Sequence, residues 1–446
     1  MGNAVLGTIG DHHRNQRKML TPVFSIAHMR EMTPIFHDVV RRLAKTIVRQ
    51  VSQGEKEIDM LSWMTRTALE LIGQSGYGYS FDTLEPDAPL HPFYTSIKNL
   101  NRAAHNNAMV LARYFILPYV YGVGSPRFQR AVVDLIPWKK LHELRDMTDV
   151  MHNTSLEIFA ATKQAMEKGD LAEKTTRVGA GKDIMSVLLK YNASASEKER
   201  LPDDELLAQI SALTFAAMDT TSNSLSRILH ILSENPEAQE KLRDEIRAAQ
   251  ADHGTEELDY DALNALPYLD AVCRETLRLY APIPFLMREA QADTVLPLSN
   301  PIVSTDGKPL HEILVPKRTR IMMSLLHCNR DPDIWGDDAA EWKPERWMSP
   351  LPESVARARV PGVYSNLMTF MGGGRSCLGF KFSQLEMKVV LCHLLPAIQV
   401  APSGRKVKWQ LNLLYQPTTE DAELTSIGDR KLQLPLNISL AEPGSQ

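Results

Sequence analysis

Residues 370–379, FMGGGRSCLG, place one cysteine between a glycine-rich segment and an apolar run that continues to about Leu394. Glycines favour a turn with positive φ or a close backbone approach, and the run that follows is typical of a helix. Cys377 would then lie where the positive end of a helix and the charge of Arg375 favour a thiolate. Such a thiolate could be a nucleophile, a redox sensor or a soft metal ligand; a buried structural cysteine is the simpler alternative.

The spacing F-x-x-G-x-R-x-C-x-G decides between these alternatives. It is the haem-ligand signature of the cytochrome P450 family, and the chain resembles that family from about Gly10 to its C-terminus. The resemblance implies a mainly α fold with small β-sheets, organised as a single haem-thiolate domain over residues 1–446. It also implies that Cys377 is the axial thiolate of haem b iron, the ligation known for this family. Four residues of the same segment would shape the cofactor site: Phe370, Gly373, Arg375 and Gly379.

Composition excludes several other classes of protein. With 43% hydrophobic and 23% charged residues, the chain is typical of a globular fold and not of a disordered one. Its formal net charge of −4 gives no basic surplus for nucleic acid. The four cysteines include no C-x-x-C pair, which argues against a disulfide framework or a thiolate zinc site and favours a reducing compartment.

Membrane association gives two different expectations. No run of about 20 apolar residues is present, and the first residues lack the basic region of a signal peptide, so the sequence alone predicts a soluble chain. The family resemblance instead implies the cytosolic face of the endoplasmic reticulum membrane. Residues 111–123 form either an apolar surface loop or a buried turn between helices. By resemblance they are the substrate-access lid, touching the membrane through the stretch that begins with Phe115 and ends with Tyr121.

A dense charge cluster occupies residues 11–18. One interpretation is a solvated helix face. By resemblance, His13 and Arg17 match the family's W-x-x-x-R pair, with histidine in place of tryptophan, and a spacing of four puts both side chains on one helical face. Arg17 would then pair with one haem propionate and His13 would donate a hydrogen bond to the other.

Apolar residues recur at helical spacing in residues 29–50, 58–75 and 201–233, which predicts core helices there. The longest of these contains Asp219 and Thr220 within its apolar stripe, where polar residues need partners. A bent helix with a back-bonded threonine is one interpretation.

The other interpretation of that helix rests on the resemblance of residues 216–221 to the family's A-G-x-[DE]-T-T, where the helix loosens for dioxygen. Ala216 would leave space over the haem, Thr220 would orient water, and Asp219 would relay protons. Ala217 departs from the usual glycine.

Glu275 and Arg278 face one way on a predicted helix because they are three residues apart. As a surface ion pair they would contribute only a few tenths of a kcal/mol. The resemblance implies more: this is the family's E-x-x-R helix, and Arg346 belongs to the later P-E-R-[FW] segment. The three would form a buried network that holds the cysteine loop.

Residues 285–297 and 318–328 are predicted as short strands, and residues 409–419 as a hairpin that lines the pocket. By resemblance the first strand passes the haem, so Arg288 would bind a propionate. The apolar character of the pocket predicts an apolar substrate. The expected pocket residues are Leu213, Ile283, Phe285 and Leu286.

The helix of His13 and Arg17 lies much nearer the start of this chain than in membrane-bound family members. The resemblance therefore implies a chain that is shortened at the N-terminus and lacks the anchor, the first helices and part of the small β-domain. We accordingly expect the strands near Phe285 and Arg318 to lack partners and to expose an edge. We also expect the haem to be open on one side and weakly held.

Together these motifs predict a monooxygenase that inserts one oxygen atom of O2 into an apolar natural product, such as a terpenoid, or a lipid. No flavin or nicotinamide fingerprint is present, so a separate NADPH-dependent reductase would supply electrons, docking on Arg14, Lys18 and Lys381. A haem-thiolate isomerase or peroxygenase is an alternative, but the Asp219-Thr220 pair favours the monooxygenase. A truncated haem-binding protein without activity is the third interpretation.

Overall fold

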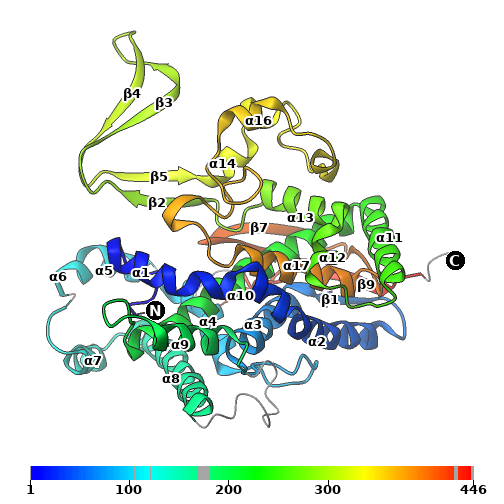
Figure 1. Cartoon of the computed structure of the whole chain (residues 1–446), viewed down its shortest axis with the longest axis horizontal. Helices are drawn as coiled ribbons and strands as arrows, with labels where there is room; N and C mark the ends of the chain where they lie inside the picture. The colour runs from blue at the N-terminus through cyan, green and yellow to red at the C-terminus, as the bar shows by residue number, and fades with distance from the viewer. Residues whose placement is uncertain (1, 105–106, 121, 168–180, 426–429, 443–446) are drawn as a thin grey trace.

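The structure is a computed structural model that describes residues 2–104, 107–120, 122–167, 181–425 and 430–442 (Figure 1). The first half is helical: α1 (Gly10–Leu20), α2 (Ile26–Val51), α3 (Met60–Tyr77), α4 (Pro92–Ala104), α5 (Asn107–Phe115), α6 (Leu117–Val120), α7 (Pro126–Leu135), α8 (Lys139–Glu167), α9 (Ile184–Ser194) and α10 (Asp203–Glu234). The second half adds α11 (Pro236–His253), α12 (Tyr260–Ala265), α13 (Pro267–Leu279), α14 (Leu325–Arg330), α15 (Pro332–Trp335), α16 (Glu353–Ala358) and α17 (Phe380–Leu394). Three short 3-10 helices are η1 (Thr21–Phe24), η2 (Pro344–Met348) and η3 (Gly373–Arg375).

The strands form small antiparallel sheets. The three-stranded sheet has the order β1-β9-β6, from β1 (Lys56–Asp59), β9 (Pro435–Leu440) and β6 (Ile398–Pro402). Three strand pairs complete the set: β2 (Phe285–Glu289) with β5 (Arg320–Ser324), β3 (Thr294–Val303) with β4 (Pro309–Val315), and β7 (Val407–Asn412) with β8 (Leu414–Thr419). The prediction of a mainly α fold with small β-sheets is confirmed.

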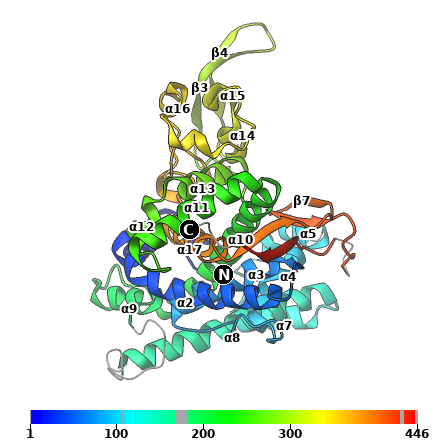
Figure 2. The ribbon, with the colours of Figure 1, turned by 90° about the vertical axis from the view of Figure 1, so that its right-hand side faces the viewer.

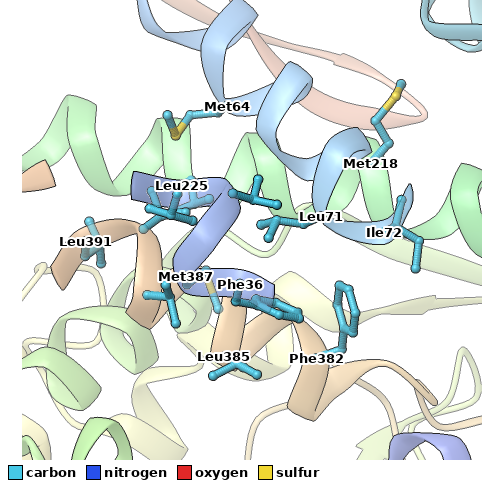
Figure 3. Packing of buried hydrophobic residues seen from close by; sticks show 14 of the residues in the cluster. Phe36, Met64, Leu71, Ile72, Met218, Leu225, Phe382, Leu385, Met387 and Leu391 are labelled. Carbon is cyan, nitrogen blue, oxygen red and sulfur yellow. The ribbon is translucent and has the colours of Figure 1, made fainter. Parts of the chain in front are cut away.

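The core lies where α10 crosses α3 and where α17 packs on α2. Figure 3 shows side chains from these four helices meeting, among them Phe36 of α2, Leu71 of α3, Leu225 of α10 and Phe382 of α17. The rings of Phe36 and Phe382 lie 4.9 Å apart at 67°, an edge-to-face contact that aromatic pairs favour. This packing holds α10 and the start of α17, which follows the cysteine loop, in fixed relation.

The three core helices predicted from apolar spacing are present as α2, α3 and α10. Local chemistry marks several helix starts. The Ser25 hydroxyl accepts the backbone N–H of His28 at the start of α2, and the Asp183 carboxylate accepts that of Ser186 at the start of α9. Acidic residues fill the first turn of α10, where they stabilise the positive end of the helix dipole.

Two expectations are wrong. The strands near Phe285 and Arg318 do have partners, because β2 and β5 pair with each other from Phe285 opposite Ser324 to Glu289 opposite Arg320. Among the described residues their sheet has these two strands alone, so the expected unpaired edge is present. Residues 111–123 are not a plain loop, since the end of α5 and all of α6 fall within them. Their apolar side chains are exposed all the same; Phe115 is 69% and Tyr119 is 81% exposed. Tyr121 lies outside the described residues.

The β3–β4 hairpin extends away from the rest of the chain in both views (Figures 1 and 2). Both strands expose apolar side chains, including Val303 and Leu314. Within the described ranges, no helix combines the length and the apolar character needed to cross a bilayer.

Candidate active site

The cysteine loop is a closed turn built on glycine. The Cys377 N–H donates to the Phe370 carbonyl (2.8 Å), and the Ser376 N–H donates to the Gly373 carbonyl (3.1 Å). Gly373 has a φ of +68°, which L side chains rarely adopt. At Gly372, a Cβ atom would lie 1.7 Å from the Pro361 carbonyl oxygen, so no larger residue fits without moving backbone. The glycine-rich spacing is therefore required by this turn.

Cys377 faces a cavity whose empty volume, counting space open to solvent, is about 980 Å³. That size is at the upper end of small-molecule sites, which span about 300–1,000 Å³. The walls come from the cysteine loop, α1, α10 and α17, and are mostly apolar. Nine predicted site residues line it: His13, Arg17, Leu213, Ala216, Thr220, Phe370, Arg375, Cys377 and Gly379.

The surroundings of Cys377 act on its thiol in opposite directions. Desolvation raises the pKa of Cys377, while the Gly379 N–H and the charge of Arg17 lower it. The side chain is exposed to the cavity, yet desolvation is the largest effect. Desolvation thus opposes the thiolate that the sequence predicts here, and α17 begins only at Phe380, three residues after the cysteine. A cation in the cavity would reverse the balance.

Three basic side chains line the same cavity. Arg17 donates to the Ser376 carbonyl (2.7 Å) and hydroxyl (3.3 Å), and Arg375 donates to the Thr8 carbonyl (2.8 Å). Desolvation lowers the pKa of both arginines, and desolvation with the two arginine charges lowers the pKa of His13. In the part of the chain that the structure describes, neither arginine forms an ion pair with a carboxylate. These charges are thus available to an anionic ligand.

Helix α10 presents Ala216 and Thr220 to the cavity without interruption of its helical hydrogen bonding. The Thr220 hydroxyl donates to the Ala216 carbonyl at 2.7 Å. The back-bonded threonine is thus present, but in a continuous helix, so the expected loosening of the helix is not observed. Because its proton is engaged, the Thr220 oxygen is an acceptor toward the cavity.

Asp219 does not line the cavity. Its carboxylate is buried and pairs with Lys98 of α4 at 2.8 Å; the two side chains are 6% and 16% exposed. The sequence placed Asp219 beside Thr220 but provided no sign of this lysine, which is 121 residues away. The pair connects α10 to α4, and the acid lies behind Thr220 instead of beside the cysteine.

Glu275, Arg278 and Arg346 are in contact, as the motifs predict. Arg278 donates twice to the Glu275 carboxylate, each at 2.8 Å, and both side chains are fully buried. Arg346 reaches the same carboxylate at 3.4 Å. Asn329 accepts the N–H of Met368 and donates to Thr369, so the network reaches the segment just before Phe370; Arg278 donates to the Asn329 carbonyl.

Other predicted site residues lie outside the cavity wall. Arg288 lies on β2, half-buried, and donates to the neighbouring Met287 carbonyl (2.9 Å). The charge of Arg288 still contributes to the lowered pKa of Arg375. The cavity wall also excludes Gly373, Ile283, Phe285 and Leu286. Phe285 and Leu286 lie on β2, which pairs with β5, and Ile283 lies just before that strand. Gly373 belongs to the cysteine loop itself but has no side chain to line the wall.

Sequence reasoning missed several wall residues. Val5 and Leu6, from the segment before α1, line the cavity, and the Gln209 side chain of α10 accepts the Val5 N–H at 3.1 Å. Their apolar character was visible in the sequence, but nothing local connects them with α10. Phe24, Ile72 and Phe382 complete this apolar wall.

Comparison with known proteins agrees with this geometry. The family model described as Cytochrome P450 matches residues 1–421. The chain belongs to the cytochrome P450 family. It is 50% identical over 418 residues to Cytochrome P450 monooxygenase 91 of Postia placenta, covering 94% of this chain and 76% of that protein.

A second relative, Ganoderic acid synthetase CYP5150L8 of Ganoderma lucidum, is 44% identical over 422 residues, with 94% of this chain and 76% of that protein covered. The crystal structure of a cytochrome P450 (CYP102L1) superposes with a TM-score of 0.69 at 22% identity, covering 99% of this chain and 82% of that one. This structure supports the fold alone. The family and the named relatives together make this P450 a monooxygenase.

The family implies a haem with a cysteine thiolate ligand, and the cavity fits such a group. One thiol faces an apolar space whose small residue, Ala216, leaves room on the opposite wall. Arg17 and Arg375 lack carboxylate partners within the described ranges and would face the negatively charged edge of a haem. The donor set of this P450 therefore matches the cofactor.

Proposed function

We propose that Cys377 is the axial ligand of a haem held in this cavity, and that the protein oxygenates an apolar small molecule with electrons from a separate reductase. The observation that carries the proposal is the position of the Cys377 thiol. It faces an apolar cavity between Ala216 and Thr220 on one side and Phe370 on the other, with Arg17 and Arg375 beside it. Residues 1–446 would act as one haem-thiolate domain.

When bound, a haem with a thiolate ligand supplies oxygen activation, because the thiolate favours O–O cleavage. The residues of the protein would hold the cofactor, orient it and exclude water. Phe370 and Phe382 exclude water around the Cys377 sulfur, and Arg17 and His13 orient the cofactor through its propionates, with Arg288 nearby. The network of Glu275, Arg278 and Arg346 keeps the loop in its ligating shape.

Thr220 would position a water through its acceptor oxygen, and Asp219 would supply protons from behind it. Since Lys98 holds the Asp219 carboxylate at 2.8 Å, proton supply requires that this pair opens or that water reaches the exposed part of Lys98. This revises the expected direct relay: the acid is one step removed from the cavity. General acid catalysis of this kind contributes about 10²–10⁴-fold to rate.

The substrate would be apolar, because the wall opposite the cysteine consists of side chains such as Val5, Leu6, Ile72 and Leu213. A relative with 44% identity bears the name ganoderic acid synthetase. We therefore place the reaction of this P450 in secondary metabolism, with a terpenoid or lipid-like substrate.

The reductase would dock on the basic face of Arg14, Lys18 and Lys381. Lys18 and Lys381 line one surface recess next to the cysteine side, together with Phe24. Two of the three cations have local acids, since Arg14 pairs with Asp11 and Lys18 with Glu199. These pairs are exposed and weak, so a partner's carboxylates can replace them.

Membrane contact would involve the apolar surface around α5 to α7. Phe115, Tyr119 and Leu135 are each more than two-thirds exposed, and no side chain of α7 is buried. Together with the family this surface supports peripheral contact with the cytosolic face of the endoplasmic reticulum. Binding to vesicles by the wild type and not by a Phe115→Ser, Tyr119→Ser, Leu135→Ser variant would test it.

A carbon monoxide difference spectrum of the haem-loaded chain tests the ligand assignment. We expect the band of a thiolate-ligated haem, lost in Cys377→Ser and kept in Cys328→Ser, whose cysteine is half-buried elsewhere. If Cys377→Ser retained the band, the assignment would be wrong.

Turnover with NADPH and reductase, compared with turnover on peroxide alone, tests the electron source. We expect the reductase system to support product formation and charge reversal at Lys18 and Lys381 to slow reduction, with a weaker effect at high salt. Peroxide-driven turnover at an equal rate without reductase would instead identify a peroxygenase.

A further inference from the structure

Two arginines converge on one aromatic ring outside the cysteine cavity. Arg227 of α10 and Arg330 at the end of α14 have their guanidinium carbons 4.3 Å and 5.3 Å from the centre of the Tyr280 ring. Arg227 also stacks on Trp409 of β7, 3.5 Å from the ring centre. The aromatic faces restrict both guanidinium groups through their planes and do not occupy their N–H edges.

Neither arginine has an anionic partner. Among the described residues, no carboxylate lies within ion-pair distance of Arg227 or Arg330, and Arg227 makes no hydrogen bond. Arg330 donates to the Leu279 carbonyl, but its Nε is buried with no acceptor. Glu234, about two turns along α10 from Arg227, lies 3.7 Å from His230.

This arrangement is electrostatically incomplete. Desolvation lowers the pKa of Arg227 to about 9, and the charge of Arg330 contributes to the lowering. Desolvation also lowers the pKa of Arg330. Both groups are charged at neutral pH and repel each other, and the more distant charge of Glu234 only partly offsets this repulsion at Arg227. A buried charge without a partner is costly, and a planar guanidinium matches the two oxygens of a carboxylate.

Arg227 lies on the face of α10 that carries two cavity residues, although neither arginine belongs to the cavity wall itself. Arg227 follows Thr220 by seven residues, and Thr220 follows Leu213 by seven, so all three lie on one face of α10. At 1.5 Å per residue, Arg227 lies about 10 Å along the helix from Thr220. The Tyr415 N–H of β8 donates to the Pro282 carbonyl at 3.1 Å, which fixes the hairpin carrying Trp409 against the end of α13.

We propose that Arg227 and Arg330 form a carboxylate-binding subsite for an amphiphilic acid whose apolar part occupies the cavity beside Thr220. The proposal rests on the proposed function and deepens it, because it names the substrate class as apolar carboxylic acids. These arginines are separate from Arg17 and Arg375, which line the cavity on the cysteine side.

Calorimetric titration of the haem-loaded chain with dodecanoate, 1-dodecanol and dodecyl phosphate tests the subsite. Charge-assisted hydrogen bonds predict that dodecanoate binds the wild type at least about tenfold more tightly than dodecanol. Arg227→Gln and Arg330→Gln should each reduce this preference, and the double variant should abolish it. Arg357→Gln, an exposed arginine on α16, should leave it unchanged.

Equal binding of acid and alcohol to the wild type, or an acid preference that survives in the double variant, overturns the subsite. Tighter binding of dodecyl phosphate than of dodecanoate overturns the assignment to a carboxylate. Should Arg227→Gln fold poorly by circular dichroism, Arg330→Gln and Arg330→Lys provide the same comparison. A normal carbon monoxide band without acid preference defeats this inference alone, whereas absence of the band in the wild type defeats the proposed function.

Discussion

A buried and a half-buried set of arginines in this P450 differ in how their donors are used. The buried scaffold arginines, Arg278 and Arg346, donate to carboxylates and to backbone carbonyls. Arg278 donates to Glu275 and to the Asn329, Ala339 and Glu341 carbonyls, and Arg346 contacts Glu275 and Asp338. The open arginines, Arg227 and Arg330, stack on aromatic rings and have no anionic partner within the described ranges. The two sets therefore differ in burial and, more informatively for their roles, in whether an anionic partner satisfies their donors.

The difference has an energetic meaning. Removing one partner of a fully paired, buried arginine destabilises the folded protein, because it leaves an uncompensated charge. In an open arginine the folded protein already includes the cost of an unpaired charge. Replacing that arginine should therefore change the free energy of unfolding little, and a bound anionic ligand should offset the cost. Arg17 and Arg375 are similar to the open set, since they donate only to neutral oxygens.

The largest expected effect is at the centre of the scaffold set. Glu275→Gln keeps the size of the side chain but leaves Arg278, which is fully buried, without a counter-charge, and leaves Arg346 with Asp338 as its acidic partner. We expect the free energy of unfolding to fall by about 3–5 kcal/mol, measured by urea denaturation. Glu353→Gln, which removes an exposed partner of Arg357, should leave it unchanged. A fall at Glu275 no larger than that of this control would remove the basis of the comparison.

Asp219 sharpens the comparison, because its pair with Lys98 is buried but links only two groups. Asp219→Asn keeps a hydrogen bond to Lys98 and removes the acid. We expect NADPH-driven turnover to fall about 10²-fold, with a larger solvent isotope effect. The free energy of unfolding should fall by less than in Glu275→Gln, because the Lys98 side chain is 16% exposed and can reach water. Asp244→Asn, on α11 and away from the cavity, is the control. Unchanged turnover with an unchanged isotope effect would show that Asp219 has a structural role only.

The buried histidine pair of His37 and His393 is a third kind of buried polar contact, beside the scaffold arginines and the Asp219–Lys98 pair. His37 Nε2 donates to the Leu258 carbonyl (2.8 Å), so His37 Nδ1 accepts from His393 Nε2 at 2.8 Å. Desolvation, with the charges of His37 and Arg41, lowers the pKa of His393 to about 4. The folded pKa lies below the unfolded value of about 6.5, so this contribution to stability is complete above pH 6.5 and is lost as the pH falls toward 4.

For that pair we expect wild-type stability to fall by about 2 kcal/mol more than that of His393→Phe between pH 7.5 and pH 5. Urea denaturation at both pH values measures the difference. His253→Gln, an exposed histidine at the end of α11, should follow the wild type. Identical pH dependence in the wild type and His393→Phe would contradict the assigned shift.

The smallest expected effect is at the open arginines. Arg227→Gln loses contact with Tyr280 and Trp409 but also removes an unpaired charge. We expect the free energy of unfolding without ligand to change by less than about 1 kcal/mol. A loss as large as that of Glu275→Gln would place Arg227 among the scaffold arginines and would remove the support for a carboxylate subsite.

Local patterns predicted much of this structure. Apolar spacing located α2, α3 and α10, the glycine-rich spacing located the cysteine turn, and two short motifs located Glu275, Arg278 and Arg346. Each signal is carried by residues close together in sequence or by a motif with fixed spacing. The close approach at Gly372 shows why such spacing is needed.

The remaining features depend on contacts between distant segments. Lys98 reaches Asp219 across 121 residues, and Val5 reaches Gln209 across 204. The pairing of β2 with β5 and the convergence of Arg227, Tyr280 and Trp409 likewise have no local periodicity. Tertiary packing determines these contacts. The sequence therefore identified the residues of the site but not the distant residues that contact them.

X-ray absorption at the iron edge of the haem-loaded chain tests the central assignment most directly. We predict a sulfur scatterer in the first coordination shell of the iron, absent in Cys377→Ser and retained in Cys328→Ser. A first shell with nitrogen and oxygen atoms only in the wild type, or a sulfur scatterer that persists in Cys377→Ser, would contradict Cys377 as the ligand around which this cavity is built.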